Sequence, residues 1–207
     1  YGMYNRTENY QSDCSYISQI KAFKDNVSIK SCLSYTFSVS NSQGTSLIKD
    51  RPFTAEMTRS IMLLKEKPYR PRMADYRIGV FFTGREQLGE GAKTTAPVYY
   101  ANRWDIQPSD TAAYLRGEKV KPTKQIVFYI DNTFPEKWKP YLREGVTQWN
   151  ELFEQIGFKD VVAAKDFPTD DPEFDPDNIK YSCVRYAPSS IENAMGPSWV
   201  DPRSGEI

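Results

Sequence analysis

The stretch Lys124-Gln-Ile-Val-Phe-Tyr-Ile-Asp131, followed later by Phe158-Lys-Asp-Val-Val-Ala-Ala-Lys-Asp166, decides the fold of this 207-residue chain. Residues 125–130 form a short, nearly continuous apolar run, which is typical of a strand buried on both faces. Residues 160–165 predict a second strand. A right-handed βαβ unit is the default when a helix connects two such strands, so we expect a parallel pair here.

A single long amphipathic helix is predicted between these strands. Pro140 suits its first turn, but Thr133 and Glu136 also fit a capping box, which leaves the start open by about one turn. Gly157 supplies the left-handed residue that ends the helix. Apolar residues recur at spacings of three and four and define the face expected to be buried: Trp138, Tyr141, Leu142, Val146, Trp149, Leu152, Phe153 and Ile156. The solvated face is expected to carry Lys139, Arg143, Glu144, Gln148, Glu151 and Glu154.

In the first half of the chain, apolar and polar residues alternate with the two-residue period of half-buried strands. Apolar residues alternate with small polar ones over 27–39, which predicts a long strand with one buried face, and 53–63 predicts its return strand. The polar residues 1–14 are expected to form a loosely held lead-in. The connector 65–73 contains two prolines and many basic residues, and its charges favour a solvated face over a binding patch.

Further elements follow the connector. Two strands are expected over 77–83 and 98–104, separated by a loop at 86–95. Ser109 or Asp110 can cap a short helix that stops at Gly117.

In the second half, the acidic loop 166–178 lacks the register of a calcium loop and is expected to be solvated. Residues 180–186 predict a third strand, and 193–198 suit an edge strand or a loop. The fold class predicted is α+β: an antiparallel β-rich N-terminal domain over 1–120, then a partial α/β sheet with one long helix over 121–207.

Composition excludes several classes of function. Lys plus Arg and Asp plus Glu both number 27, so the zero net charge gives no nucleic-acid footprint. No apolar run is long enough for a transmembrane segment. The sequence has no histidine, which excludes Ser-His-Asp and Cys-His pairs and an H-E-x-x-H zinc helix in this chain. Carboxylate pairs remain available for acid–base chemistry, although we regard a carboxylate-based hydrolase as remote.

The three cysteines are widely separated, which excludes a zinc knuckle. Free thiols are the favoured interpretation, and a disulfide between Cys14 and Cys32 stays open. The tryptophans are expected in the core, with Trp199 the least certain of them.

Several motifs together resemble one known family. In the second half they are Pro122-Thr-Lys-Gln-Ile-Val-Phe-Tyr-Ile-Asp131, Pro135-Glu-Lys-Trp-Lys-Pro-Tyr-Leu-Arg-Glu-Gly-Val146, Tyr181-Ser-Cys-Val-Arg-Tyr186 and Asn193-Ala-Met-Gly-Pro-Ser198 with Asp201-Pro-Arg-Ser-Gly-Glu-Ile207. In the first half they are Glu66-Lys-Pro68 with its following residues and Ala113-Tyr-Leu-Arg-Gly-Glu118. The chain is similar to bacterial metzincin-like zinc metalloproteases that carry an uncharacterised domain ahead of the peptidase domain.

This resemblance implies an endopeptidase whose activity lies outside this chain. In that family the H-E-x-x-H helix and a third histidine follow the turn that here ends at Ile207, so we expect an N-terminal fragment, inactive on its own, with no catalytic or metal-binding residues. Zinc is expected in the full-length parent, with a peptide or protein substrate and the remainder of the peptidase domain as partners. An extracytoplasmic location is implied too.

The resemblance also implies a substrate-binding segment. By analogy with metzincins, an edge strand here would pair with an extended peptide. Its residues are Asn193, Ala194, Met195, Gly196, Pro197 and Ser198. An edge strand that only closes the sheet is about as well supported. A non-catalytic extracytoplasmic binding or scaffold module is the alternative to the protease.

Overall fold

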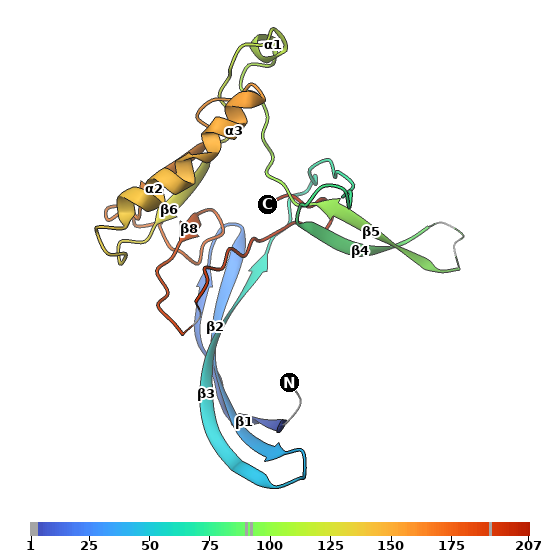
Figure 1. Ribbon diagram of the computed structural model, residues 1–207, viewed down its shortest axis with the longest axis vertical. Helices are drawn as coiled ribbons and strands as arrows, with labels where there is room; N and C mark the ends of the chain where they lie inside the picture. Colours follow the sequence, from blue (N-terminus) through green and yellow to red (C-terminus); the bar gives the residue numbers. More distant parts are fainter. Residues whose placement is uncertain (1–3, 90, 92, 191) are drawn as a thin grey trace. The chain divides into compact units, whose positions relative to one another are not determined.

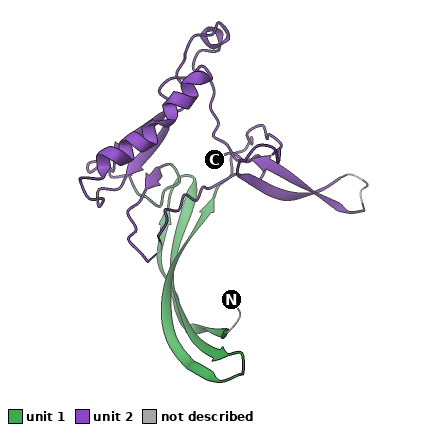
Figure 2. Ribbon diagram, in the orientation of Figure 1, with its two compact units in different colours: residues 1–63, 175–180 green, residues 64–174, 181–207 purple. Residues whose placement is uncertain are grey.

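The computed structural model describes residues 4–89, 91, 93–190 and 192–207 (Figure 1). The chain divides into two compact units (Figure 2): residues 1–63 with 175–180, and residues 64–174 with 181–207. The domain boundary expected near residue 120 stays a prediction, because one domain can contain more than one compact unit. Among the described residues, no helix has both the length and the apolar character needed to cross a membrane.

The first unit is a three-stranded antiparallel sheet of consecutive strands, strongly curved along its length (Figure 1). Its strands are β1 (Tyr4–Ala22), β2 (Asn26–Asn41) and β3 (Ser46–Met62), in the order β1-β2-β3. The predicted strand and its return strand are thus confirmed. The expected loose lead-in is wrong over its described part, because residues from Tyr4 onward pair with β2. An edge strand needs only backbone pairing, so its polar sequence gave no period to detect.

Burial in this sheet differs from the predicted face. At the start of β2 the buried residues include Asn26, Ser28 and Ser31, although the apolar alternate positions were expected to be buried. Residues 175–180, far along the chain, belong to this unit. The amide nitrogen of Asn26 donates to the carbonyl oxygen of Asp177 at 2.9 Å, and its oxygen accepts from the backbone N–H of Ile179 at 3.1 Å.

The acidic loop is therefore only partly solvated. Lys21 forms ion pairs with Asp175 at 2.9 Å and Asp177 at 2.7 Å. The hydrogen bond to Asp177 is the main cause that raises the pKa of Lys21. None of the three cysteines is in a disulfide, so the pairing of Cys14 with Cys32 that the sequence left open is not formed in this structure.

The second unit begins with a hairpin and continues into a parallel sheet. Its elements are β4 (Phe82–Leu88), β5 (Thr95–Ala101), α1 (Thr111–Leu115), β6 (Ile126–Ile130), α2 (Lys139–Thr147), α3 (Trp149–Gln155), β7 (Val162–Asp166) and β8 (Ser182–Val184). The first strand of the hairpin, predicted over 77–83, begins and ends later in the chain, at β4. The second, predicted over 98–104, begins and ends earlier, at β5. The side chain of Asp75 accepts from the backbone N–H of Arg77, which makes 75–78 a turn instead of a strand. Two residues of the predicted loop, 90 and 92, lie outside the described part of the chain.

The βαβ prediction is confirmed. β6 pairs in parallel with both β7 and β8, which gives the sheet order β7-β6-β8. Asp110 caps α1 by accepting from the backbone N–H of Ala113 at 2.9 Å, as predicted. Gly157 follows α3 with φ +88°, which is the expected left-handed helix end.

The prediction of one long helix is wrong. The segment is divided into α2 and α3 at Gln148. The hydroxyl of Thr147 donates to the carbonyl oxygen of Arg143 at 2.9 Å, and such a bond competes with the helical backbone pattern and bends helices. After the bend, the side-chain nitrogen of Asn150 donates to the carbonyl oxygen of Val162, and its side-chain oxygen accepts from the Val162 backbone N–H, both at 2.8 Å. This pair fixes α3 to the first residue of β7.

The buried face of the helical segment is also narrower than predicted. Val146 and Phe153 pack against the core, but Trp138, Trp149 and Trp199 are exposed, so the core assignment of these tryptophans is wrong. Lys139, expected in solvent, is buried. The core consists of Ala113, Val120, Ile126, Phe158, Val161 and Val162, with Trp104 and Phe128 among the residues packed against it.

Candidate functional site

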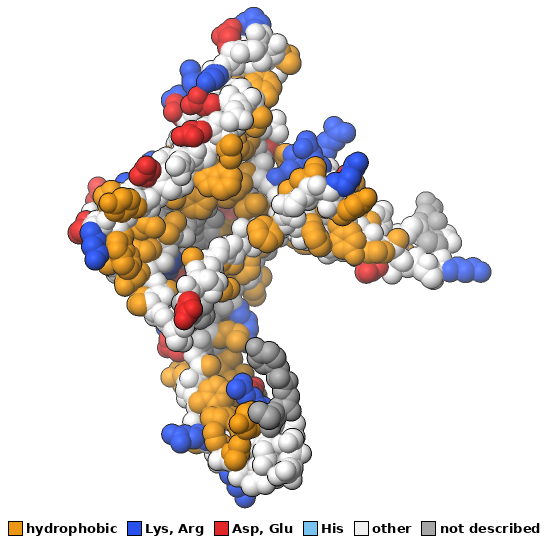
Figure 3. All heavy atoms as spheres, in the orientation of Figure 1, with side chains coloured by type: hydrophobic (Ala, Val, Ile, Leu, Met, Phe, Trp, Pro, Cys, Tyr) orange, Lys and Arg blue, Asp and Glu red, His pale blue; other side chains and the backbone are white. Residues whose placement is uncertain are grey.

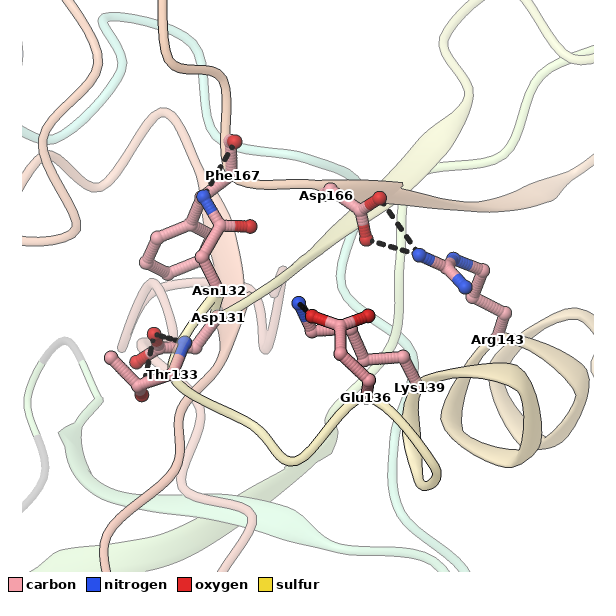
Figure 4. A network of polar contacts seen from close by, with 8 residues as sticks. All are labelled: Asp131, Asn132, Thr133, Glu136, Lys139, Arg143, Asp166 and Phe167. Carbon is pink, nitrogen blue, oxygen red and sulfur yellow. Dashed lines mark hydrogen bonds and ion pairs between the residues drawn. The ribbon is translucent and has the colours of Figure 1, made fainter.

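Charged side chains lie at the carboxyl ends of the three parallel strands, here called the carboxyl edge of the sheet. Figure 4 shows those at the ends of β6 and β7. Asp131 comes directly after β6, Asp166 is the last residue of β7, and Arg185 comes directly after β8. All three strands run in the same direction, so their ends meet at one edge. In open α/β sheets, ligands bind outside this edge, which makes it the first place to look for a site.

Asp131 is held by several hydrogen bonds at this edge. Its carboxylate accepts from the backbone N–H of Thr133 at 2.9 Å, from the Thr133 hydroxyl at 2.8 Å and from Arg185 Nε at 3.1 Å. Burial alone would raise the pKa of Asp131, but the hydrogen bonds from Thr133, Arg185 and the Tyr186 backbone outweigh it and lower the pKa. Asp131 is therefore ionised at neutral pH and is a weak general base.

The charged side chains of the helical segment beside this edge also form ion pairs. Arg143 Nη2 donates to both oxygens of Asp166 at 2.7 Å, and the buried Lys139 donates to Glu136 at 2.6 Å (Figure 4). Every carboxylate labelled in Figure 4 thus has a partner. This arrangement holds strand ends and helix together, and it offers no unpaired acid, base or nucleophile for chemistry.

We expect a pH-dependent loss of stability when Asp131 is changed to Asn. Because the folded pKa of Asp131 is lowered, its stabilising contribution is present above the unfolded pKa of about 3.9 and is lost as the pH falls through the folded pKa. At pH 7 the change should cost about 1–3 kcal/mol, and the difference from the unchanged chain should shrink below about pH 4. Urea unfolding at pH 7 and pH 3, followed by tryptophan fluorescence, measures this. Asp166→Asn, in a more exposed pair, is the control with a smaller expected cost at both pH values.

The predicted substrate-binding residues lie together in one exposed segment. Residues 192–200 belong to no helix or strand, and 193–198 are all exposed, so the alternative of a loop holds in this structure. Within the described chain, no backbone hydrogen bond joins 192–200 to another segment. The carbonyl oxygen of Ala194 accepts from the side-chain nitrogen of Asn193 at 3.2 Å, a contact inside the segment itself. Whether residues 193–198 bind a substrate stays a prediction.

The turn that follows fixes the far end of this segment. Asp201 accepts from the backbone N–H and the guanidinium of Arg203, which is the main cause that lowers the pKa of Asp201. Glu206 is buried and forms an ion pair with Lys65, and Arg203 Nη2 donates to the Lys65 carbonyl oxygen at 2.6 Å. The C-terminal turn and the basic connector are thus held together. Sequence reasoning missed this link, because it joins residues more than one hundred positions apart.

A zinc site does not fit the residues of this chain. The sequence has no histidine, and the described residues contain no group of three or more side chains able to hold a metal.

The fold defines a β-rich α+β protein with antiparallel sheets and a parallel βαβ sheet. The sequence profile of one family, described as a domain of unknown function (DUF5117), matches residues 2–109, just over half of the chain. The chain belongs to this family. No curated protein and no solved structure matches the chain significantly.

Proposed function

We propose that this chain is the front part of a zinc-dependent endopeptidase that hydrolyses peptide bonds with zinc-activated water. The observation that carries the proposal is the segment 192–200, of which residues 192–199 are exposed and whose backbone has no backbone hydrogen bond to another described segment. An extended peptide can hydrogen-bond to such a backbone and so extend the sheet, as in β-augmentation. In this proposal residues 121–207 form a scaffold, and the zinc ligands and the general base come from polypeptide outside the chain.

The paired charges at the sheet edge support a scaffold role. Asp131 after β6 pairs with Arg185 after β8, and Asp166 at the end of β7 pairs with Arg143 on α2, so these ion pairs connect the strand ends to one another and to the helix. A rigid sheet is what a peptidase needs beside a substrate-binding strand, because a misplacement of about 1 Å can cost a large factor in rate. We further propose that the parent acts outside the cytoplasm.

The test uses the natural full-length protein. Zinc content is measured on the purified protein, and cleavage of unfolded casein is measured with and without a chelator. We expect bound zinc and cleavage that the chelator abolishes and added zinc restores. Residues 1–207 alone are the matched control and should cleave nothing. A full-length protein without zinc, or with cleavage indifferent to chelation, would overturn the proposal.

Backbone recognition by the segment gives a sharper prediction. Proline substitutions at Ala194 and Met195 each remove one N–H, and neighbouring N–H groups of an extended segment point to opposite sides. In the full-length enzyme we expect one of the two to raise KM about tenfold, with kcat changed less, because one substrate hydrogen bond is lost.

The control for this pair is Met195→Ala, which removes the side chain and keeps the N–H. It should leave KM within about twofold, because the interaction resides in the backbone. If the alanine variant is impaired as strongly as the proline variants, or if neither proline has an effect, the segment does not bind substrate through its backbone.

A non-catalytic binding or scaffold module is the second candidate, and the first unit favours it. One face of its sheet carries a hollow of about 600 Å³ lined by Tyr4, Arg6, Glu8, Phe37, Val39, Leu47, Ile48 and Phe53. Tyr35 stacks on Phe53 with ring centroids 5.3 Å apart, and apolar side chains gather along this sheet in Figure 3. A full-length protein without zinc or peptidase activity would select this function.

A further inference from the structure

We propose that Arg70, Arg72 and Arg103 form a binding site for a small polyanion carrying phosphate or carboxylate groups. With Pro71 they line a cavity of about 360 Å³ in the second unit. Figure 3 shows Lys and Arg side chains gathered over the segment that precedes β4, where the first two of these arginines lie. This site is independent of the proposed peptidase activity.

Backbone pairing holds two of the three arginines, Arg72 and Arg103, in place. The backbone N–H of Ala101 donates to the carbonyl oxygen of Arg72 at 2.9 Å, which pairs the connector with the end of β5. The backbone N–H of Arg103 donates to the Gly205 carbonyl oxygen at 2.9 Å, and its carbonyl oxygen accepts from Ile207 at 3.1 Å. Arg103 is thus clamped between the connector and the C-terminal turn, and the cavity is preorganised.

The Arg103 guanidinium is also oriented. Its Nη2 donates to the carbonyl oxygen of Arg70 at 2.8 Å, and its Cζ lies 4.3 Å from the centre of the Tyr69 ring. Its Nε is buried and has no hydrogen-bond partner among the described residues. A buried donor without an acceptor is rare and costly in proteins.

The charge of this cavity is uncompensated. In the part of the chain that the structure describes, no carboxylate forms an ion pair with any of its three arginines. The acids of the C-terminal turn have other partners, since Glu206 pairs with Lys65 and Asp201 with Arg203. Three like charges around one cavity repel one another, so an anion that enters it is favoured.

The ligand class follows from the lining. Guanidinium groups match the planar and tetrahedral oxyanions of carboxylates and phosphates, to which they can donate two parallel hydrogen bonds. The lining has no apolar side chain except that of Pro71, so a mainly apolar ligand has little to contact. The volume is at the lower end of the range for small-molecule sites, which suits a compact polyanion.

The test is calorimetric titration of residues 1–207 with pyrophosphate and, separately, with citrate at constant ionic strength. We expect saturable binding of at least one probe, and Arg70→Gln and Arg72→Gln each to weaken it about tenfold, because each removes a charge-assisted hydrogen bond. Both side chains are exposed, so neither variant should unfold the chain. Binding of pyrophosphate alone identifies phosphoryl groups, and binding of citrate alone identifies carboxylates.

Arg85→Gln, an equal loss of charge on β4 away from the cavity, is the matched control. It should leave the dissociation constant unchanged. No saturable binding of either probe, or equal weakening by all three variants, overturns the proposal, because either result shows that no defined site exists.

Discussion

Replacing Gly205 with alanine should lower the free energy of unfolding of the second unit by about 3 kcal/mol. Gly205 has φ +75°, and an added Cβ would lie 2.5 Å from the carbonyl oxygen of Ala101. The left-handed conformation and the clash with backbone act together, and backbone cannot move aside as a flexible side chain can. The turn would then lose its contact with the backbone of Arg103. All four tryptophans belong to the second unit, so tryptophan fluorescence during urea unfolding reports its stability selectively.

Gly117→Ala separates the two causes. Gly117 has φ +85°, but an added Cβ meets nothing within 4 Å, so only the conformational cost of about 1 kcal/mol is expected. Equal losses for the two variants would show that the approach of Gly205 to Ala101 contributes nothing, and that the turn is not packed against the end of β5.

Local periodicity was enough to predict the βαβ unit. The apolar runs ending at Ile130 and starting near Val161 are short and continuous, and the handedness rule leaves one arrangement for the strands. The bend between α2 and α3 was not predictable in this way. It depends on the hydroxyl of Thr147 and on Asn150 reaching Val162, and neither bond changes the hydrophobic period.

The first unit shows the limit of sequence patterns at long range. Alternation predicted β2 and β3, but it could not predict that residues 175–180 belong to the same unit. That association buries Asn26 and pairs Lys21 with two aspartates. A strand that alternates apolar with small polar residues can bury either face, and the covering segment decides which.

The two candidate sites, the segment 193–198 and the arginine cavity, differ in whether the sequence predicted them. The segment 193–198 was identified through family resemblance, and the structure places it in one continuous exposed stretch. The arginine cavity was not predicted, and the basic connector was expected to be a solvated face. Its third arginine, Arg103, reaches it only because β5 pairs with the connector. The pattern of charges along the sequence does not show that Arg103 lies beside the connector in the folded chain.

Ile130→Ala should cost about 3 kcal/mol, the second large effect that we expect. Ile130 ends the central strand of the parallel sheet, and its exposed fraction is 0%. In register it lies beside Asp166 on one side and Val184 on the other. Alanine removes most of the buried side chain and leaves a cavity on one face of the sheet, which the surrounding structure can close only in part. The measurement is again urea unfolding followed by tryptophan fluorescence.

Two further variants show whether the loss comes from burial. Ile130→Val removes one methylene and should cost about 1 kcal/mol, whereas Ile156→Ala makes the same chemical change as Ile130→Ala at a residue that is 58% exposed. Ile156→Ala should stay within about 0.5 kcal/mol of the unchanged chain. If Ile130→Ala were as mild as Ile156→Ala, the side chain of Ile130 would not be packed, and the carboxyl edge could not hold its charged groups in fixed positions. A large loss at Ile130 alone supports a rigid central strand, on which both Asp131 and the proposed scaffold role depend.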